Sequence, residues 1–312
     1  MALARHKTVI LIVGPTAVGK TSVAIRLAKR FKTEIISADS RQCFKELDIG
    51  VARPSERELQ TIRHYFIASQ SIHDNVNAGT FEHYALEKAK ELFQKHDQII
   101  VTGGTGLYVR TFCEGLDEIP GVPGDKRNEI ISNYDRNGLE WLKKQVQEKD
   151  PRFYLSGEIQ NPHRLMRALE VAEATGRSIL EFRSGQKETR DFNIVKIGLE
   201  LPKEELHRNI NARVDQMIDA GLVEETRQLT PYKNLNALQT VGYAEIFDYL
   251  DRKLSLEKAA ELIKKNTRQY AKRQMTWFKK DKEIEWFSPS QLTQIESYLI
   301  SIIATDFTDE HR

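Results

Sequence analysis

The sequence contains little cysteine: only Cys43 and Cys113 occur among its 312 residues. Neither has a His or Cys neighbour at metal-ligand spacing, which argues against a zinc site and against a disulfide scaffold. The apolar run at residues 8–13 stops at Gly14, so it is too short to span a bilayer, and no signal-peptidase site follows it. We therefore expect a cytoplasmic protein in a reducing compartment, with no membrane association.

A large excess of one charge is also missing, because 47 Lys and Arg stand against 45 Asp and Glu. The net charge of +2 neither requires nor excludes a polyanionic partner. There are no internal repeats and no low-complexity tracts. A chain of 312 residues with 40% hydrophobic residues suits a soluble enzyme of two compact lobes.

Strand and helix patterns alternate in the first third of the chain. The continuous apolar run at residues 8–13 is typical of a strand buried on both faces of a parallel sheet. Residues 34–38 and 98–102 are further strand candidates, and residues 21–31 and 81–96 have helical periodicity. This alternation predicts an α/β fold with a doubly wound parallel sheet and right-handed crossovers.

The pattern changes at Asp117, where DEIPGVPGDKR concentrates proline and glycine. Only helical segments follow until a strand pattern returns at residues 191–201, and residues 203–280 are helical again. This arrangement predicts a helical domain inserted into the α/β core. The predicted domains are the core with its basic C-terminal helices, residues 1–116 and 191–312, and an all-helical insertion, residues 117–190.

The segment GPTAVGKT, residues 14–21, matches the P-loop pattern and lies between a predicted strand and a predicted helix. Backbone N–H groups of such a loop point at a bound anion, Lys20 adds a positive charge, and Thr21 can hold Mg²⁺. The alternative, a glycine turn with a chance lysine, does not explain the strand and helix around it. The fold is therefore predicted to be P-loop NTPase-like, with the nucleotide-binding or ATP-binding site that this class usually has. The residues predicted to bind phosphate are Gly14, Pro15, Thr16, Ala17, Val18, Gly19, Lys20 and Thr21.

The acidic residue that usually completes the metal site of P-loop kinases and ATPases is missing from the strand at residues 98–102. That strand ends in Thr102 and two glycines. Asp39 of SADSRQ follows another predicted strand, and a carboxylate at that sheet edge can bind metal or act as a general base. A simple turn aspartate is the alternative.

Six segments in order resemble those of the bacterial-type tRNA dimethylallyltransferases, or isopentenyl-tRNA transferases. The resemblance runs from about residue 9 to about residue 277. It implies transfer of a dimethylallyl group from dimethylallyl diphosphate to the N6 amine of the adenine just 3′ of the anticodon in tRNA, with release of diphosphate. The P-loop would then hold the diphosphate of the prenyl donor, with Mg²⁺ as cofactor. The segments are GPTAVGKT, SADSRQ, GGTGLYVR, NPHRLMRALEV, LQTVGYAEI and TRQYAKRQMTWF.

The resemblance also implies roles for single residues in the reaction. Asp39 would accept the proton of the amine, and Thr105 would contact the target adenine. Lys20 would act in catalysis by neutralising the leaving diphosphate, together with Arg213. An arginine on a helix surface is the alternative for Arg213.

The target adenine must leave the stack of the anticodon loop to reach the site, which is cheaper in a single strand than in a duplex. Asp39, Ser40, Arg41 and Gln42 match the family's segment around the flipped base. Gln42 is the residue best suited to read the base edge, because its amide has both a donor and an acceptor.

Two further parts of the chain are implied to contact the tRNA anticodon stem-loop. One is the predicted helix of NPHRLMRALEVAEATG, with Asn161 as cap, Pro162 in its first turn and Gly176 at its end. The other is the basic C-terminal segment, in which Tyr270, Trp277 and Phe278 are predicted to stack on bases. A solvated cationic helix face is the alternative for both. The implied contacts are Arg127, His163, Arg164, Leu165, Met166, Arg167, Gln239, Gly242, Tyr243, Arg268, Lys272 and Arg273.

Three other functions fit parts of the sequence. A P-loop kinase that uses ATP on a small metabolite would not need the basic C-terminal helix. A prenyltransferase of free nucleotides would need neither the insertion nor the basic segments, and an RNA-binding module without chemistry would not need a phosphate loop beside Asp39. We expect the tRNA-modifying transferase, acting as a monomer.

Overall fold

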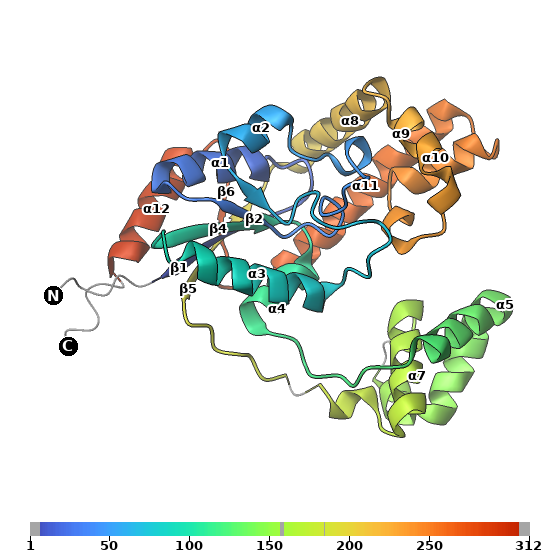
Figure 1. Cartoon of the computed structure of the whole chain (residues 1–312). Coiled ribbons are helices and arrows are strands. Elements are labelled where there is room, and N and C mark those ends of the chain that lie inside the picture. The colour runs from blue at the N-terminus through green and yellow to red at the C-terminus, as the bar shows by residue number, and fades with distance from the viewer. Residues whose placement is uncertain (1–6, 157–158, 184, 306–312) are drawn as a thin grey trace. The chain divides into compact units, whose positions relative to one another are not determined.

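The computed structural model describes residues 7–156, 159–183 and 185–305 (Figure 1). The chain divides into two compact units. Unit 1 consists of Met1–Cys113 and Thr189–Arg312, and unit 2 is Glu114–Glu188. The first residue of unit 2 thus lies three positions before the predicted start of the insertion, and its last residue lies two positions before the predicted end.

Unit 1 is built on a sheet in which every strand pair is parallel. Within the described residues the sheet has six strands, in the order β3-β2-β4-β1-β5-β6. The predicted doubly wound α/β fold is confirmed, but two strands were missed because segments of two and three residues show no periodicity. The strands are β1 (Thr8–Val13), β2 (Ile35–Ser37), β3 (His64–Tyr65), β4 (Gln98–Gly103), β5 (Asn193–Leu199) and β6 (Glu285–Phe287).

Both faces of the sheet are covered by helices, as Figure 1 shows. Because side chains alternate along a strand, Val9 and Leu11 enter one apolar cluster while Ile10 and Ile12 enter the other. The first cluster includes side chains of α3, α4 and α10, and the second includes side chains of α1, α8 and α12. The helices of unit 1 are α1 (Lys20–Phe31), α2 (Glu56–Thr61), α3 (Ala78–Leu92), α4 (Gly106–Glu114), α8 (Lys203–Asp219), α9 (Leu222–Gln228), α10 (Tyr243–Leu250), α11 (Leu256–Phe278) and α12 (Leu292–Thr305).

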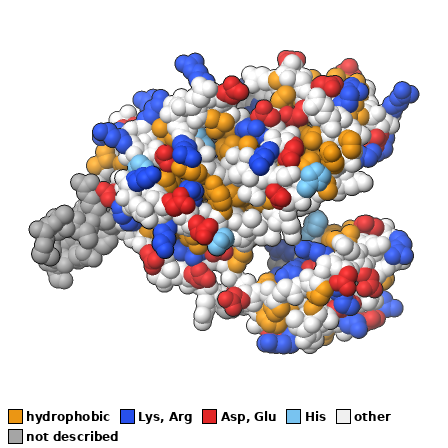
Figure 2. Space-filling model, in the orientation of Figure 1, with side chains coloured by type: hydrophobic (Ala, Val, Ile, Leu, Met, Phe, Trp, Pro, Cys, Tyr) orange, Lys and Arg blue, Asp and Glu red, His pale blue; other side chains and the backbone are white. Residues whose placement is uncertain are grey.

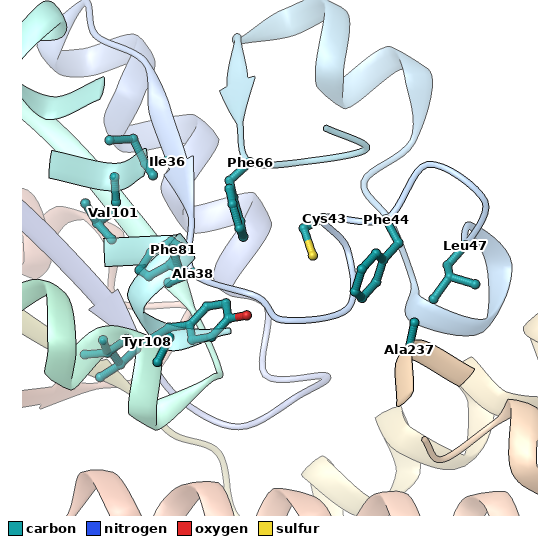
Figure 3. Packing of buried hydrophobic residues seen from close by; sticks show 14 of the residues in the cluster. Ile36, Ala38, Cys43, Phe44, Leu47, Phe66, Phe81, Val101, Tyr108 and Ala237 are labelled. Carbon is teal, nitrogen blue, oxygen red and sulfur yellow. The ribbon is translucent and has the colours of Figure 1, made fainter. Parts of the chain in front are cut away.

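An aromatic group anchors the segment that follows β2 (Figure 3). Phe81 stacks on Tyr108 at a centroid distance of 4.6 Å and meets Phe66 edge-on at 5.2 Å. Cys43 and Phe44 are buried in the same cluster, so this stretch of chain is fixed by core packing. Burial raises the pKa of the Cys43 thiol to about 12, which makes it an inert packing residue.

Among the described residues of unit 2, helices are the only regular secondary structure, as predicted. Asn161 caps α7 by accepting the amides of His163 and Arg164, and Gly176 ends that helix with a φ of 68°. The unit has an apolar core of its own, to which α5, α6 and α7 contribute. Its helices are α5 (Gly124–Lys149), α6 (Pro151–Leu155) and α7 (Pro162–Thr175). Across the described part of both units, no helix has the length and apolar character needed to cross a bilayer.

Candidate active site

Three loops meet at the carboxyl ends of β1, β2 and β4, which are neighbours in the parallel sheet. Glycine permits this close approach, because a Cβ on Gly103 would lie 2.1 Å from the carbonyl oxygen of Ala38. A Cβ on Gly14 would likewise lie 2.6 Å from the carbonyl oxygen of Leu199. The loops enclose a cavity of about 450 Å³, a size typical of small-molecule sites.

The loop after β1 has the backbone of an anion-binding turn. Gly14 and Gly19 have φ values of 146° and 101°, and α1 starts immediately afterwards. Among the described residues, no acceptor lies within hydrogen-bond reach of the amides of Val18, Gly19 and Lys20. Free amides at the start of a helix are well suited to a phosphate group.

Lys20 lines the cavity and folds back over the loop. Its Nζ donates to the carbonyl oxygens of Gly14 at 3.0 Å and Pro15 at 2.7 Å, which leaves one of its three protons for a ligand. Burial lowers the pKa of Lys20 to about 8; the negative charge of Asp39 opposes this shift, and Arg213 adds to it. The site therefore holds a cation that an incoming anion would stabilise.

Arg213 extends from α8 to the phosphate loop. Its Nη1 lies 3.4 Å from Oγ1 of Thr16, and its side chain lines the same cavity. Burial lowers its pKa as well. The alternative of an arginine on an open helix surface is therefore wrong, and the structure brings Arg213 together with Lys20 as predicted.

Asp39 holds a turn and also presents a carboxylate oxygen to the cavity. Its Oδ1 accepts the amides of Arg41 at 2.9 Å and Gln42 at 3.2 Å. Its Oδ2 has no hydrogen-bond donor among the described residues. From the sequence, Asp39 is either a turn residue or a metal ligand or general base. The structure shows that one side chain can hold the turn and still leave an oxygen for the second role.

Thr105 joins the turn after β4 to the loop after β2. Its Oγ1 accepts the amide of Ser40 at 3.0 Å and lies 3.3 Å from Oγ of Ser40. Tyr270 of α11 lines the cavity beside them and interacts with the Thr105 hydroxyl. Burial, and then the charge of Asp39, raise the pKa of the Tyr270 phenol to about 12, so this group stays neutral.

The two donor protons of Gln42 are already used. Its Nε2 donates to the carbonyl oxygens of Val51 at 3.2 Å and Ala52 at 2.9 Å. Only Oε1 is left for a ligand, so the prediction that Gln42 offers both a donor and an acceptor is wrong. Arg41 also lines the cavity, and its Nη1 donates to the carbonyl oxygens of Asn236 and Ala237.

Several residues predicted to touch tRNA belong instead to the interior. Leu165 and Met166 are buried in the core of unit 2, and Tyr243 is fully buried, with its hydroxyl 2.5 Å from Oε1 of Glu225. Their side chains are packed in the interior and are not available to RNA, so the predicted tRNA contact of these residues could be made only through their backbones. Gly242 is buried too, but its backbone lines the cavity.

Two of the three aromatic side chains predicted to stack on bases are packed against other parts of unit 1. Phe278 is buried in the core, and a Cβ on Gly106 would lie 2.4 Å from the ring of Trp277, which shows how closely that ring packs on the turn. Tyr270 is 37% exposed and lines the cavity. Of the three, Tyr270 alone is placed to stack on a base.

Two of the predicted tRNA contacts in unit 2, Arg127 and Arg167, share one acidic partner. Arg127 Nε and Arg167 Nη1 each lie 3.1 Å from a carboxylate oxygen of the buried Glu170. His163 and Arg164 are exposed at the start of α7. This pairing holds Arg127 and Arg167 in place while leaving their outer guanidinium atoms accessible to a phosphate.

The three predicted basic contacts of unit 1, Arg268, Lys272 and Arg273, lie on α11. Lys272 and Arg273 are exposed, whereas Arg268 is half-buried and donates to Oδ1 of Asn211 at 2.6 Å. Gln239 is exposed, and its amide donates to the carbonyl oxygen of Lys233. On the face shown in Figure 2, positive and negative side chains are interspersed, as the small net charge suggests.

Several residues that line the cavity were not predicted as site residues, among them Gln274. Gln274 of α11 is buried and bonds both the phosphate loop and the turn after β4. It belongs to the family segment TRQYAKRQMTWF, but the lysines and arginines around it predict solvent exposure, so it was not predicted as a site residue.

A glycine loop between strand and helix, a buried lysine and a carboxylate at one edge of a parallel sheet define a P-loop α/β protein. The protein family described as IPP transferase matches residues 42–281. The chain is 46% identical over 294 residues to the tRNA dimethylallyltransferase of Cytophaga hutchinsonii, covering 94% of this chain and 97% of that one. The chain therefore belongs to the IPP transferase family, which confirms the resemblance of the six segments.

Solved structures agree with this membership. The full-length tRNA isopentenylpyrophosphate transferase of Bacillus halodurans superposes with a TM-score of 0.72 at 31% identity, over 98% of this chain and 100% of that one. A eukaryotic dimethylallyltransferase acting on tRNA superposes with a TM-score of 0.78 at 26% identity, over 98% and 80%. The similarity thus extends over both units of the chain.

Proposed function

We propose that this protein transfers the dimethylallyl group of dimethylallyl diphosphate to N6 of the adenine 3′-adjacent to the anticodon in tRNA. One observation carries the proposal beyond family membership: a single cavity is lined by the phosphate loop and by the segment from Asp39 to Gln42. A donor diphosphate and an acceptor base can therefore meet in one place.

In the proposed reaction, N6 of the adenine attacks the allylic carbon as the bond from that carbon to the diphosphate oxygen breaks. The amine becomes positively charged and loses a proton, which Oδ2 of Asp39 accepts. The products are the prenylated adenine, diphosphate and the protonated carboxyl group, which returns its proton to water. A general base placed in this way typically contributes about 10² to 10⁴ in rate.

The leaving diphosphate gains negative charge as the bond breaks, and three groups are placed to stabilise it. These are the free amides at the start of α1, Lys20 and Arg213. Donors aimed at developing charge in a partly dry cavity act more strongly than they do in water. The same groups also fix the orientation of the donor, since they approach from one side of the cavity.

Thr21 would hold Mg²⁺ together with the diphosphate. The described residues contain no cluster of three or more His, Cys, Asp or Glu side chains able to hold a metal. Mg²⁺ commonly keeps several waters and binds through one protein ligand and substrate phosphates, so the single Thr21 hydroxyl in the cavity suits this mode. When bound, the ion would supply further charge neutralisation for the leaving group.

Recognition of the tRNA would use the base-facing and the phosphate-facing residues separately. At the base, Gln42 Oε1 is an acceptor suited to the N6 amine, and Tyr270 supplies a ring for stacking. The exposed Lys272, Arg273 and Arg164 are suited to the phosphate backbone.

A direct assay tests the proposal. The purified protein is given unmodified tRNA and Mg²⁺ with either labelled dimethylallyl diphosphate or γ-labelled ATP, and AMP replaces tRNA in a parallel reaction. We expect label in tRNA from the prenyl donor alone. Phosphate transfer from ATP without prenylated tRNA would establish the kinase instead, and prenylation of AMP in preference to tRNA would establish a free-nucleotide enzyme.

A further inference from the structure

Gln274 connects two loops that belong to opposite halves of the proposed reaction. Its Oε1 accepts the amide of Thr16 in the phosphate loop at 2.8 Å, and its Nε2 donates to the carbonyl oxygen of Gly104 at 2.9 Å. The side chain is 6% exposed and comes from α11, more than 150 residues later in the chain than either partner. One buried amide therefore joins the loop on the donor side to the turn on the adenine side.

The amide satisfies both partners at once, because it carries an acceptor and a donor on separate atoms. The Thr16 amide requires an acceptor and the Gly104 carbonyl requires a donor, so a carboxylate would serve only the first and an apolar chain would serve neither. Gly104 also leaves the room that this contact needs, because a Cβ there would lie 2.3 Å from Nε2. The bridge thus accounts for an amide side chain at position 274 and for a glycine at position 104.

Both loops carry groups that the proposed reaction uses. Thr16 contacts Arg213, and Thr105, the residue after Gly104, contacts Ser40. A shift of one loop against the other would change the distance from the diphosphate to the adenine. A misplacement of about 1 Å can reduce a rate by about 100-fold.

We infer that Gln274 is a positioning residue that fixes the phosphate loop against the adenine-side turn so that the allylic carbon and N6 align. This inference rests on the proposed transferase function. Gln274 takes no part in bond making, so its effect appears in kcat once both substrates are bound. The proposed phosphate contacts of Lys272 and Arg273 on α11 do not depend on Gln274.

The test compares Gln274→Met and Gln274→Glu with the wild type. Methionine fills a similar volume without either hydrogen bond, and glutamate keeps the acceptor for Thr16 but loses the donor for Gly104. Gln94→Met, an exposed glutamine at the end of α3, is the matched control. The measurements are kcat, the KM for dimethylallyl diphosphate, the Kd for tRNA and the Tm.

We expect kcat to fall about 100-fold in Gln274→Met, with the tRNA Kd within about twofold of the wild type and Gln94→Met unchanged. Gln274→Glu should also lose kcat, and this variant carries the test if Gln274→Met does not fold. A wild-type kcat in either folded variant would overturn the inference. So would equal losses in kcat and tRNA affinity, because a general loosening of the fold predicts that pattern. A wild type that prenylates no tRNA would instead refute the proposed function.

Discussion

Replacing Asp39 by Asn separates the turn role that the structure shows from the general-base role that we propose. An Asn side chain keeps a carbonyl oxygen that can accept the amides of Arg41 and Gln42, so the turn is retained. It removes the carboxylate oxygen that would take the proton of the adenine amine. We expect kcat to fall by about 10² to 10⁴, which corresponds to about 3 to 5 kcal/mol of transition-state stabilisation.

Asp39→Ala provides the comparison, because alanine loses the turn acceptor as well. Its kcat should match that of Asp39→Asn, while its free energy of unfolding should be lower by about 1 to 2 kcal/mol, the value of two backbone hydrogen bonds to a side chain. Prenyl transfer is measured at saturating substrates and tRNA binding by a filter assay. Because the charge of Asp39 raises the pKa of Lys20, both variants lower that pKa, so the assays are repeated at several pH values below 8 to keep Lys20 protonated.

The outcome decides between a base and a purely structural aspartate. A base predicts a large loss of kcat in Asp39→Asn with a tRNA Kd that changes less than about threefold. A kcat of Asp39→Asn close to that of the wild type would refute the general-base role. Equal losses of turnover and tRNA affinity in both variants would do so as well.

Three further predictions use other residues. Lys20 would bind the anion when protonated, and its pKa is about 8 in the free site. The kcat/KM for dimethylallyl diphosphate should therefore fall as the pH rises above 8. Lys20→Arg stays charged and should show no such fall. Lys272→Ala should weaken tRNA binding and reduce the slope of log K against log salt concentration by about one, with kcat at saturating tRNA unchanged. The exposed Lys29 of α1 is the control, because its replacement by Ala should leave that slope unchanged. Glu170→Gln should destabilise unit 2 by about 2 kcal/mol, seen as faster hydrogen exchange in α5 and α7, without loss of tRNA affinity because its two arginine partners keep their charge.

Titration calorimetry tests the proposed mode of metal binding. We expect Mg²⁺ to bind the protein weakly alone and well with diphosphate present, because Thr21 is the only protein ligand that the proposal provides. Tight binding of Mg²⁺ to the protein alone would contradict this and would indicate a preformed site.

Local signals were sufficient for the parts of the fold that have strong periodicity. The strand at residues 8–13, the helix after the phosphate loop and the capped helix of unit 2 have the predicted positions. Short edge strands gave no signal, and α12 was not predicted. The phosphate loop could be located from sequence because its glycines and lysine must be contiguous to surround one anion.

The other site residues are not contiguous, and here the sequence was less informative. A helix face that is polar in sequence can lie against another loop, as Gln274 does. An aromatic residue in a family segment, such as Tyr243, can belong to the core. The donor protons of Gln42 are used by carbonyl groups nine and ten residues away, which no spacing rule would indicate. Such pairings depend on how the backbone folds, so they require a structure.

The arrangement of the sheet explains why one cavity can serve two substrates. The strands β1, β4 and β2 are adjacent and parallel, so the loops that follow them emerge at one edge although they lie far apart in sequence. The loop after β1 supplies groups for an anion, the loop after β2 supplies Asp39, and the turn after β4 holds Thr105 against Ser40. Helices α8 and α11 then close the site with Arg213 and Gln274, one charged and one neutral. In the proposed reaction, this P-loop fold would place the nucleophile opposite a diphosphate leaving group without the acidic strand end that kinases use. The carboxylate would be needed to remove a proton, and it would therefore belong on the side of the base.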